Sequence, residues 1–109
     1  MRKENSSNSI NEKALQKFCN ASKTLALFSG RWKFSLLFQL LETATSYSDF
    51  KVLLPKISDR TLSRQLNELL EDGLIAKNKD KVSSIYTITE KGRKLEPLLH
   101  LLADFPTEG

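Results

Sequence analysis

Hydrophobic side chains recur every three to four residues along most of this chain, and that spacing predicts amphipathic helices. The spacing holds over three segments, residues 11–29, 32–43 and 58–72. In the second segment the apolar positions form a broad stripe, which indicates burial on more than one side. In the third segment Ser58 is the expected N-cap and Gly73 the expected stop, because glycine readily adopts the conformation that ends helices.

A short helix is expected over residues 49–54, between the second and third segments. Ser48 is its predicted N-cap, and Pro55 ends it because the residue before a proline avoids the helical region. The link to the next helix, residues 54–58, is therefore tight. Two helices joined by so short a turn are typical of a helix-turn-helix unit.

Beyond the third segment the pattern changes to a period of two, which predicts strands. One strand begins at Ile75, residues 78–81 form a turn, and a second strand covers residues 82–88. Thr89 is expected to cap a last helix that carries leucines on one face. Pro97 lies inside that helix and is expected to kink it, because proline removes a backbone hydrogen bond.

Residues 1–10 are polar and predict a mobile arm, because they offer almost nothing to bury. Residues 11–109 are then expected to form one domain, which suits a chain of 109 residues. The expected fold is mainly α-helical with a small β-hairpin. The order of its elements is that of a winged helix-turn-helix, with the recognition helix over 58–72 and the wing over 75–88.

The balance of charge is moderately basic, since 17 lysines and arginines stand against 13 acidic residues and give a net charge of +4. Such a balance suits a nucleic-acid binder, although many proteins without that role are equally basic. No apolar run approaches the ~18 residues that a membrane span needs. No apolar stretch follows the charged start, so a secretory signal peptide is not expected either. A cytoplasmic protein without a membrane partner is the resulting expectation.

Catalytic and metal-binding chemistry finds little support in the residues present. The single histidine, His100, has Asp104 one helical turn away, but no nucleophile can be placed with them. The sequence has no glycine-rich phosphate loop, and one histidine with one cysteine falls short of a metal site. We therefore expect no enzyme, no metal and no cofactor.

The start of the recognition helix carries side chains that suit DNA. Arg60 and Arg64 lie one turn apart and share a face, and arginine pairs with guanine edges or binds phosphate. Lysines alternate along the hairpin, where a wing would lie on the DNA backbone or in the minor groove. The predicted DNA contacts are Ser58, Arg60, Thr61, Ser63, Arg64 and Gln65 on the helix, and Lys77, Lys79 and Lys81 on the wing.

Two other interpretations of this surface stay open. A run of charges on a helix is often only a solvated face, although here it follows a capped turn and precedes a basic hairpin. A winged helix can also dock a protein partner without binding DNA. Salt dependence separates DNA binding from docking, because log affinity falls with log salt at a slope of about −0.9 per phosphate neutralised.

Several stretches of the chain, in this order, carry a resemblance to a known family. They are Cys19 with residues 28–33 (FSGRWK), residues 57–66 (ISDRTLSRQL), residues 70–75 (LEDGLI), and residues 85–93 (IYTITEKGR) with Leu95, Pro97 and Leu98. The chain resembles the HxlR-type winged helix-turn-helix transcriptional regulators, a branch close to the MarR regulators. The resemblance covers Cys19 to Phe105, which is most of the chain.

The resemblance implies a dimeric, sequence-specific DNA-binding regulator whose first and last helices form the dimer contact. Its DNA partner would be a double-stranded, pseudo-palindromic operator, because a symmetric dimer presents two recognition helices. The residues expected at the dimer contact are Leu15, Phe18, Leu95, Leu98, Leu99 and Leu102. The leucines of the last helix form more apolar surface than so small a chain easily hides, unless that stripe packs within the monomer.

Cys19 is the one cysteine of the chain, so an internal disulfide and a cysteine-built zinc site are excluded. In the resembled family, several members sense oxidants, aldehydes or quinones through an N-terminal cysteine, and Cys19 matches the position of that cysteine. Lys23 lies one turn away, and positive charge favours the reactive thiolate. The alternative is a small buried hydrophobe at a helix interface, which Phe18 beside it favours. Cys19 is thus a candidate redox sensor or a core residue.

Overall fold

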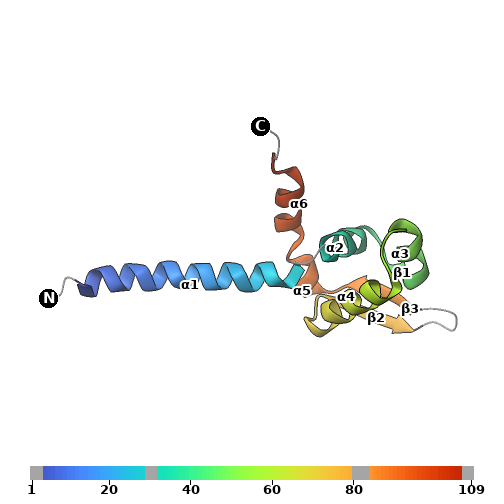
Figure 1. The fold of residues 1–109 in the computed structure, drawn as a ribbon, viewed down its shortest axis with the longest axis horizontal. Coiled ribbons are helices and arrows are strands. Elements are labelled where there is room, and N and C mark those ends of the chain that lie inside the picture. The colour runs from blue at the N-terminus through green and yellow to red at the C-terminus, as the bar shows by residue number, and fades with distance from the viewer. Residues whose placement is uncertain (1–3, 29–31, 80–83, 107–109) are drawn as a thin grey trace.

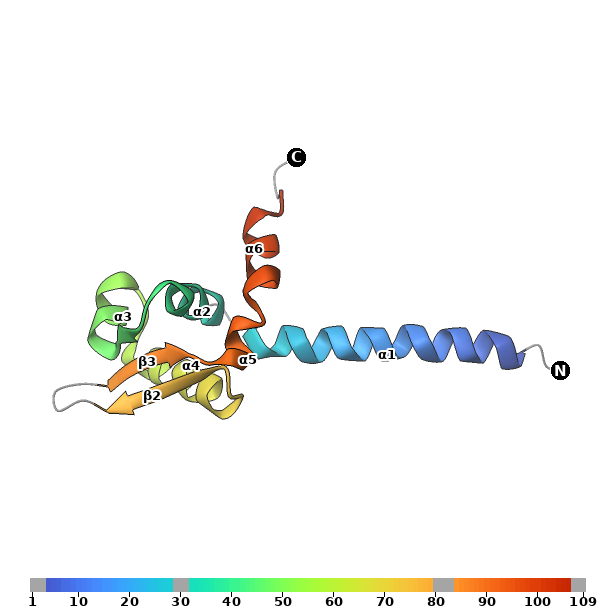
Figure 2. The ribbon, with the colours of Figure 1, turned by 180° about the vertical axis from the view of Figure 1, so that it is seen from behind.

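Two helices project from a body of four helices and a small sheet in the computed structural model (Figure 1). The structure describes residues 4–28, 32–79 and 84–106. In chain order its elements are α1 (Glu4–Phe28), α2 (Lys33–Glu42), β1 (Thr45–Ser46), α3 (Tyr47–Leu53), α4 (Asp59–Glu71), β2 (Ile75–Lys79), β3 (Ser84–Ile88), α5 (Glu90–Arg93) and α6 (Glu96–Asp104). Both views show α1 and α6 leaving the body beside α5, in different directions (Figures 1 and 2).

The predicted fold class is confirmed, because a mostly helical chain carries a small antiparallel sheet of order β1-β3-β2. The wing strands β2 and β3 pair from Ile75 opposite Ile88 to Lys79 opposite Ser84. The third strand, β1, was not predicted from the sequence. It has only two residues, which is too short to show a period, and it pairs with a strand far along the chain.

The core lies where α2, α3 and α4 meet the sheet. Phe50 of α3 is fully buried and its ring lies 6.4 Å from that of Tyr86 on the central strand. The buried hydrophobic side chains are Leu36, Leu37, Leu40, Phe50, Ile57, Leu62, Leu66, Leu69, Leu74, Ile75, Tyr86, Leu95 and Leu99. They come from α2, α3, α4, β2, β3 and α6 and from the loops that join them. Three of them, Leu62, Leu66 and Leu69, hold α4 against the core.

The short helix α3 begins earlier than the sequence predicted. Its N-cap is Ser46, whose hydroxyl accepts a hydrogen bond of 3.1 Å from the backbone N–H of Asp49. The prediction of Ser48 as the cap is therefore wrong. The reason is that Ser46 pairs with Ile85 in the sheet, which gives it the extended backbone that a cap needs.

The last helical segment is broken rather than kinked. Thr89 caps α5 as predicted, because its hydroxyl accepts from the N–H of Gly92 at 3.1 Å. The chain then starts a new helix, α6, and Pro97 lies in the first turn of that helix. A kink at Pro97 was thus the wrong expectation, since a proline in the first turn removes no hydrogen bond that the helix would otherwise make.

α1 begins at Glu4, well before the start that the apolar spacing indicated. The helix therefore includes most of the polar segment that was expected to be a mobile arm. An existing helix gains one backbone hydrogen bond for each residue added, so polar residues extend it without any core to bury. The apolar period could not reveal this extension, because residues 4–9 contain no apolar side chain.

Candidate nucleic-acid interface

The N-terminal turns of α4 are exposed and firmly capped. Ser58 accepts a hydrogen bond of 3.1 Å from the N–H of Thr61 and donates one of 2.9 Å to its hydroxyl. On the opposite face of the helix, Leu62, Leu66 and Leu69 are buried against the core. The cap and this buried stripe fix which side chains of α4 face outward.

Most of the predicted contacts on α4 lie on its outer face. Arg60 and Arg64 are exposed one turn apart, Ser58 and Ser63 are also exposed, and Thr61 is half-buried. The structure thus brings the hydroxyls and both guanidinium groups to one end of the helix. That end offers hydrogen-bond donors and positive charge, which suit the phosphates and base edges of DNA.

Gln65 does not belong to this set, which corrects the prediction from the sequence. Its side chain is only 6% exposed and lies on the core face with Leu62 and Leu69. Among the described residues its Oε1 atom has no hydrogen-bond partner. The polar side chain suggested an outward position, but its spacing from the buried leucines decides the face.

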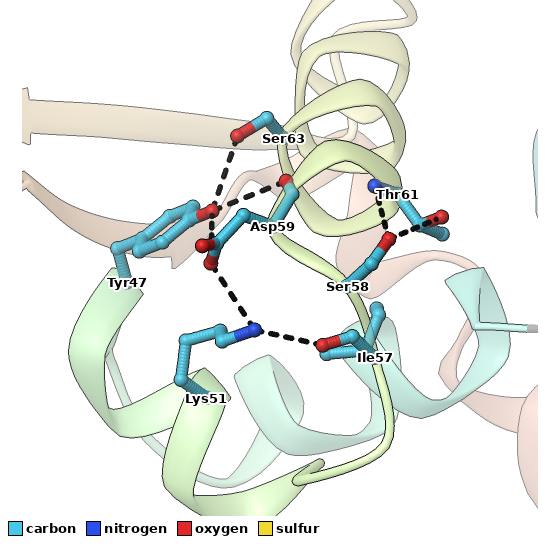
Figure 3. Close-up of polar contacts among 7 residues, drawn as sticks. All are labelled: Tyr47, Lys51, Ile57, Ser58, Asp59, Thr61 and Ser63. Carbon is cyan, nitrogen blue, oxygen red and sulfur yellow. Dashed lines mark hydrogen bonds and ion pairs between the residues drawn. The ribbon is translucent and has the colours of Figure 1, made fainter.

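A network of polar contacts joins α3 to the start of α4 (Figure 3). Lys51 of α3 donates to the carbonyl oxygen of Ile57 at 2.7 Å and pairs with Oδ1 of Asp59 at 3.1 Å. The hydroxyl of Tyr47 lies 3.2 Å from the carbonyl oxygen of Asp59, 3.3 Å from its Oδ1 and 3.2 Å from Oγ of Ser63. The sequence analysis did not find this network, since only the fold brings α3 beside α4.

The network lowers the pKa of Asp59. The hydrogen bond from Lys51, and then the positive charge of Lys51, hold the pKa of the Asp59 carboxyl below its ordinary value. The carboxylate, which is ionised at neutral pH, has an ammonium group beside it. This matters because Asp59 lies between Ser58 and Arg60, at the exposed tip of the helix.

The wing carries two of its three predicted lysines within the described residues. Lys77 and Lys79 are exposed on β2 and share one side of the strand, because side chains alternate with a period of two. The ammonium group of Lys77 lies 5.9 Å from the centre of the Tyr86 ring. Lys81 lies outside the described residues. In both views the hairpin points to the same end of the molecule as α3 and the first turns of α4 (Figures 1 and 2).

A second ion pair ties α2 to α4 at the C-terminal end of α4. The ammonium group of Lys33 lies 2.8 Å from Oε1 of Glu68, with 9% and 45% of the two side chains exposed. The hydrogen bond from Lys33, and then its charge, hold the pKa of Glu68 below the ordinary value. Lys33 is nearly buried, so this pair fixes α4 against the helix that follows α1.

The projecting helices expose much of their apolar surface. Leu15 is 58% exposed and Phe18 64% on α1, and Leu102 is 44% exposed on α6. Leu98 is half-buried, and it lines a pocket of about 370 Å³ between the two helices together with Ala21, Thr24, Leu25 and Leu102. Leu95 and Leu99 are buried in the core of the monomer, which corrects their assignment to a dimer contact.

Cys19 is exposed in the middle of α1, so its thiol is not part of the monomer core. Lys23, one turn further along the helix, is exposed as well. Among the described residues no group of three or more His, Cys, Asp or Glu side chains could hold a metal ion. Within the same ranges, no helix is long and apolar enough to cross a membrane.

Comparisons with known proteins find relatives of this sequence and solved structures with this fold. Residues 27–108 match the model of the family described as HxlR-like helix-turn-helix. The chain is 37% identical over 90 residues to an uncharacterized HTH-type transcriptional regulator of Bacillus subtilis (strain 168), YdeP, with 80% of this chain and 70% of YdeP covered. YdeP is named as a transcriptional regulator and not as an enzyme.

Solved structures with the same fold include regulators described by their redox state. The redox regulator HypR in its oxidized form superposes with a TM-score of 0.74 at 30% identity, covering 80% of this chain and 93% of HypR. Its reduced form gives a TM-score of 0.75 at 29% identity, covering 79% and 88%. A structure assigned to the MarR family, from Porphyromonas gingivalis W83, gives a TM-score of 0.75 at 30% identity, covering 84% and 92%.

Proposed function

Because this chain belongs to the HxlR-like helix-turn-helix family and is a transcriptional regulator of the helix-turn-helix type, we propose that it binds double-stranded DNA as a homodimer. The N-terminal half of α4 enters the major groove, and the wing lies on the backbone or in the minor groove. The observation that carries this proposal is the pair Arg60 and Arg64, exposed one turn apart on the capped end of α4. A regulator that binds DNA acts where the DNA is, so we place it in the cytoplasm.

Each part of the proposed interface has a chemical role. Arg64 and Arg60 are able to pair with guanine edges through two parallel hydrogen bonds, or to bind phosphate. The hydroxyl groups of Ser58, Thr61 and Ser63 suit phosphate oxygens and base edges. Lys77 and Lys79, with Lys81 beyond them in the sequence, add positive charge to the wing. Phosphate contacts of this kind set position and affinity, and base contacts set specificity.

The exposed apolar faces of α1 and α6 support the homodimer. Exposed Leu15, Phe18 and Leu102, with half-buried Leu98, offer a surface that water solvates poorly. A second copy covering this surface would place two α4 helices on one face of DNA. A pseudo-palindromic operator with half-sites about 10 bp apart follows from that symmetry.

Cys19 is the proposed redox-responsive or electrophile-responsive residue. Its thiol is exposed on α1, and the structurally similar HypR is described as a redox regulator. The chain has one cysteine, so a disulfide would join two subunits or join Cys19 to a small thiol. In either case two thiols give up two electrons and two protons to hydrogen peroxide, which becomes two molecules of water. A shift of α1 would then reset the spacing of the recognition helices.

The first experiment selects DNA from a random-sequence pool and titrates the selected site at several salt concentrations. We expect Arg64→Ala to weaken binding by about 1–3 kcal/mol and to relax the preference at one base pair. Arg93→Ala removes an exposed arginine outside the predicted contacts, so it serves as the matched control. Unchanged affinity and preference in Arg64→Ala would refute the role of α4. Binding to no DNA at any salt would favour a protein-docking module instead.

The redox proposal needs a separate experiment. The wild type and Cys19→Ser are titrated with the same DNA before and after treatment with hydrogen peroxide. We expect the peroxide to change the affinity of the wild type, with recovery on reduction, and to leave Cys19→Ser unaffected. An equal change of DNA affinity in both proteins would show that Cys19 is not the residue that responds to peroxide.

A further inference from the structure

Asp59 places a negative charge where the proposed interface meets DNA. It is the first residue of α4, its side chain is 77% exposed, and it stands between Ser58 and Arg60. An unpaired carboxylate at this point would repel the phosphates that its neighbours are proposed to contact. The structure therefore needs some means of reducing this repulsion.

We propose that Lys51 is a positioning residue that neutralises the charge of Asp59, and is not itself a phosphate contact. Its ammonium group lies 2.7 Å from the carbonyl oxygen of Ile57 and 3.1 Å from Oδ1 of Asp59 (Figure 3). Two of its three donors are thus directed at the turn and the carboxylate. The side chain is 32% exposed, which is far less than that of Asp59.

Tyr47 completes the arrangement from the same helix. Its hydroxyl lies within 3.3 Å of Oδ1 of Asp59 and 3.2 Å of Oγ of Ser63. Figure 3 shows the carboxylate between the tyrosine hydroxyl and the ammonium group of Lys51. The carboxylate is therefore drawn toward α3, and the hydroxyl of Ser63 is held beside it. Both contacts orient the outer face of α4.

This inference rests on the proposed DNA binding. The two possible roles of Lys51, neutralising Asp59 or binding phosphate, predict different results for a double variant. If Lys51 neutralises Asp59, removing the carboxylate should cancel the loss that follows from removing the lysine. If Lys51 contacts phosphate, the two substitutions should act independently. Coupled neighbours are recognised by this departure from additivity in a double-mutant cycle.

The test measures DNA affinity for Lys51→Gln, Asp59→Asn and the double variant. We expect Lys51→Gln to lower affinity about tenfold, and the double variant to return within about threefold of the wild type. Lys56→Gln, an exposed lysine on the same turn, is the control for losing one positive charge. Adding Asp59→Asn to Lys56→Gln should change DNA affinity by the same factor as adding Asp59→Asn to the wild type. A double variant that stays as weak as Lys51→Gln would overturn the proposal.

A readout without DNA separates this inference from the proposed function. The titration of the Asp59 carboxyl is followed by NMR in the wild type, Lys51→Gln and Tyr47→Phe, with thermal melting to confirm folding. We expect the pKa of Asp59 to rise toward its ordinary value in Lys51→Gln and, by less, in Tyr47→Phe. A pKa that is equal in wild type and Lys51→Gln would overturn the inference. Failure of the wild type to bind any DNA would count against the proposed function alone.

Discussion

Two glycines at the base of the wing meet different physical demands. Gly73 has a φ of +76°, the left-handed conformation that ends α4, and a Cβ there would have ample space. Gly92 on α5 has ordinary backbone angles but no space, since a Cβ would lie 2.2 Å from the carbonyl oxygen of Leu74. It would also lie 2.7 Å from Cγ1 of Ile88. One glycine is required by backbone conformation and the other by close packing.

Gly92→Ala should therefore destabilise the protein more than Gly73→Ala. We expect a loss of about 1–3 kcal/mol for Gly92→Ala, because a backbone carbonyl must move to admit the methyl group. Gly73→Ala should cost about 1 kcal/mol, from the left-handed conformation alone. Denaturant unfolding of both variants measures these values, and Arg93→Ala on the same short helix is a control. Equal stability of Gly92→Ala and wild type would contradict the packing argument.

At the scale of elements, the ion pair between Lys33 and Glu68 joins α2 to α4. Lys33 is 9% exposed and Glu68 is 45% exposed, so the pair is partly shielded from water. The folded protein holds the pKa of Glu68 below its ordinary value of 4.5. A carboxyl whose pKa is lowered by folding stabilises the protein above its unfolded pKa, and this contribution is lost as the pH falls through the folded pKa.

The stability of the wild type should accordingly fall more steeply than that of Glu68→Gln below about pH 4.5. The reason is that Glu68→Gln has no carboxyl to protonate at this position. Denaturant unfolding between pH 7 and pH 3 gives both curves, and Glu71→Gln, on the exposed side of the same helix, is the control. Parallel curves for wild type and Glu68→Gln would show that the pair contributes nothing.

The recognition helix could be predicted from the sequence, and the contacts around it could not. A run of buried leucines, a serine cap and Gly73 mark α4 nearly to the residue. Gln65 was assigned to the wrong face because its polar type outweighed its spacing. The strand β1 and the contacts of Lys51 depend on residues that are distant in sequence, so no local pattern contains them. The exposed positions of Arg60 and Arg64 could be predicted because the residue type, the spacing of four residues and the place at the start of the helix all indicated the outer face.

At the scale of the whole molecule, the chain is far from spherical. Its radius of gyration is 18.2 Å and its longest extent is 68 Å, whereas a compact domain of this length has a radius near 13 Å. The excess comes from α1, which projects away from the body (Figure 1). A long helix with exposed Leu15 and Phe18 gains little from its own chain and much from covering by a second one.

We therefore expect the protein to sediment as a dimer at micromolar concentration, and Phe18→Glu to shift it toward monomer. A charge on the apolar face would have to be desolvated on association, which disfavours the dimer. Analytical ultracentrifugation over a range of concentrations measures the change. Asn67→Glu adds the same charge at an exposed position of α4 and should leave the dimer intact. A monomeric wild type would refute this expectation.

The projecting helix has a consequence for how such regulators diverge. The family match begins at residue 27, so nearly all of α1 lies outside it, and among the described side chains of α1 only Leu27 packs against the core. Substitutions in the described part of α1 before Leu27 therefore change neither the core nor the surface of α4. If the proposed dimer forms through α1, two copies that arise by gene duplication would keep one operator while changes in α1 stop their subunits from associating. The residues that select the partner subunit, on α1, then change independently of the residues on α4 that select the operator.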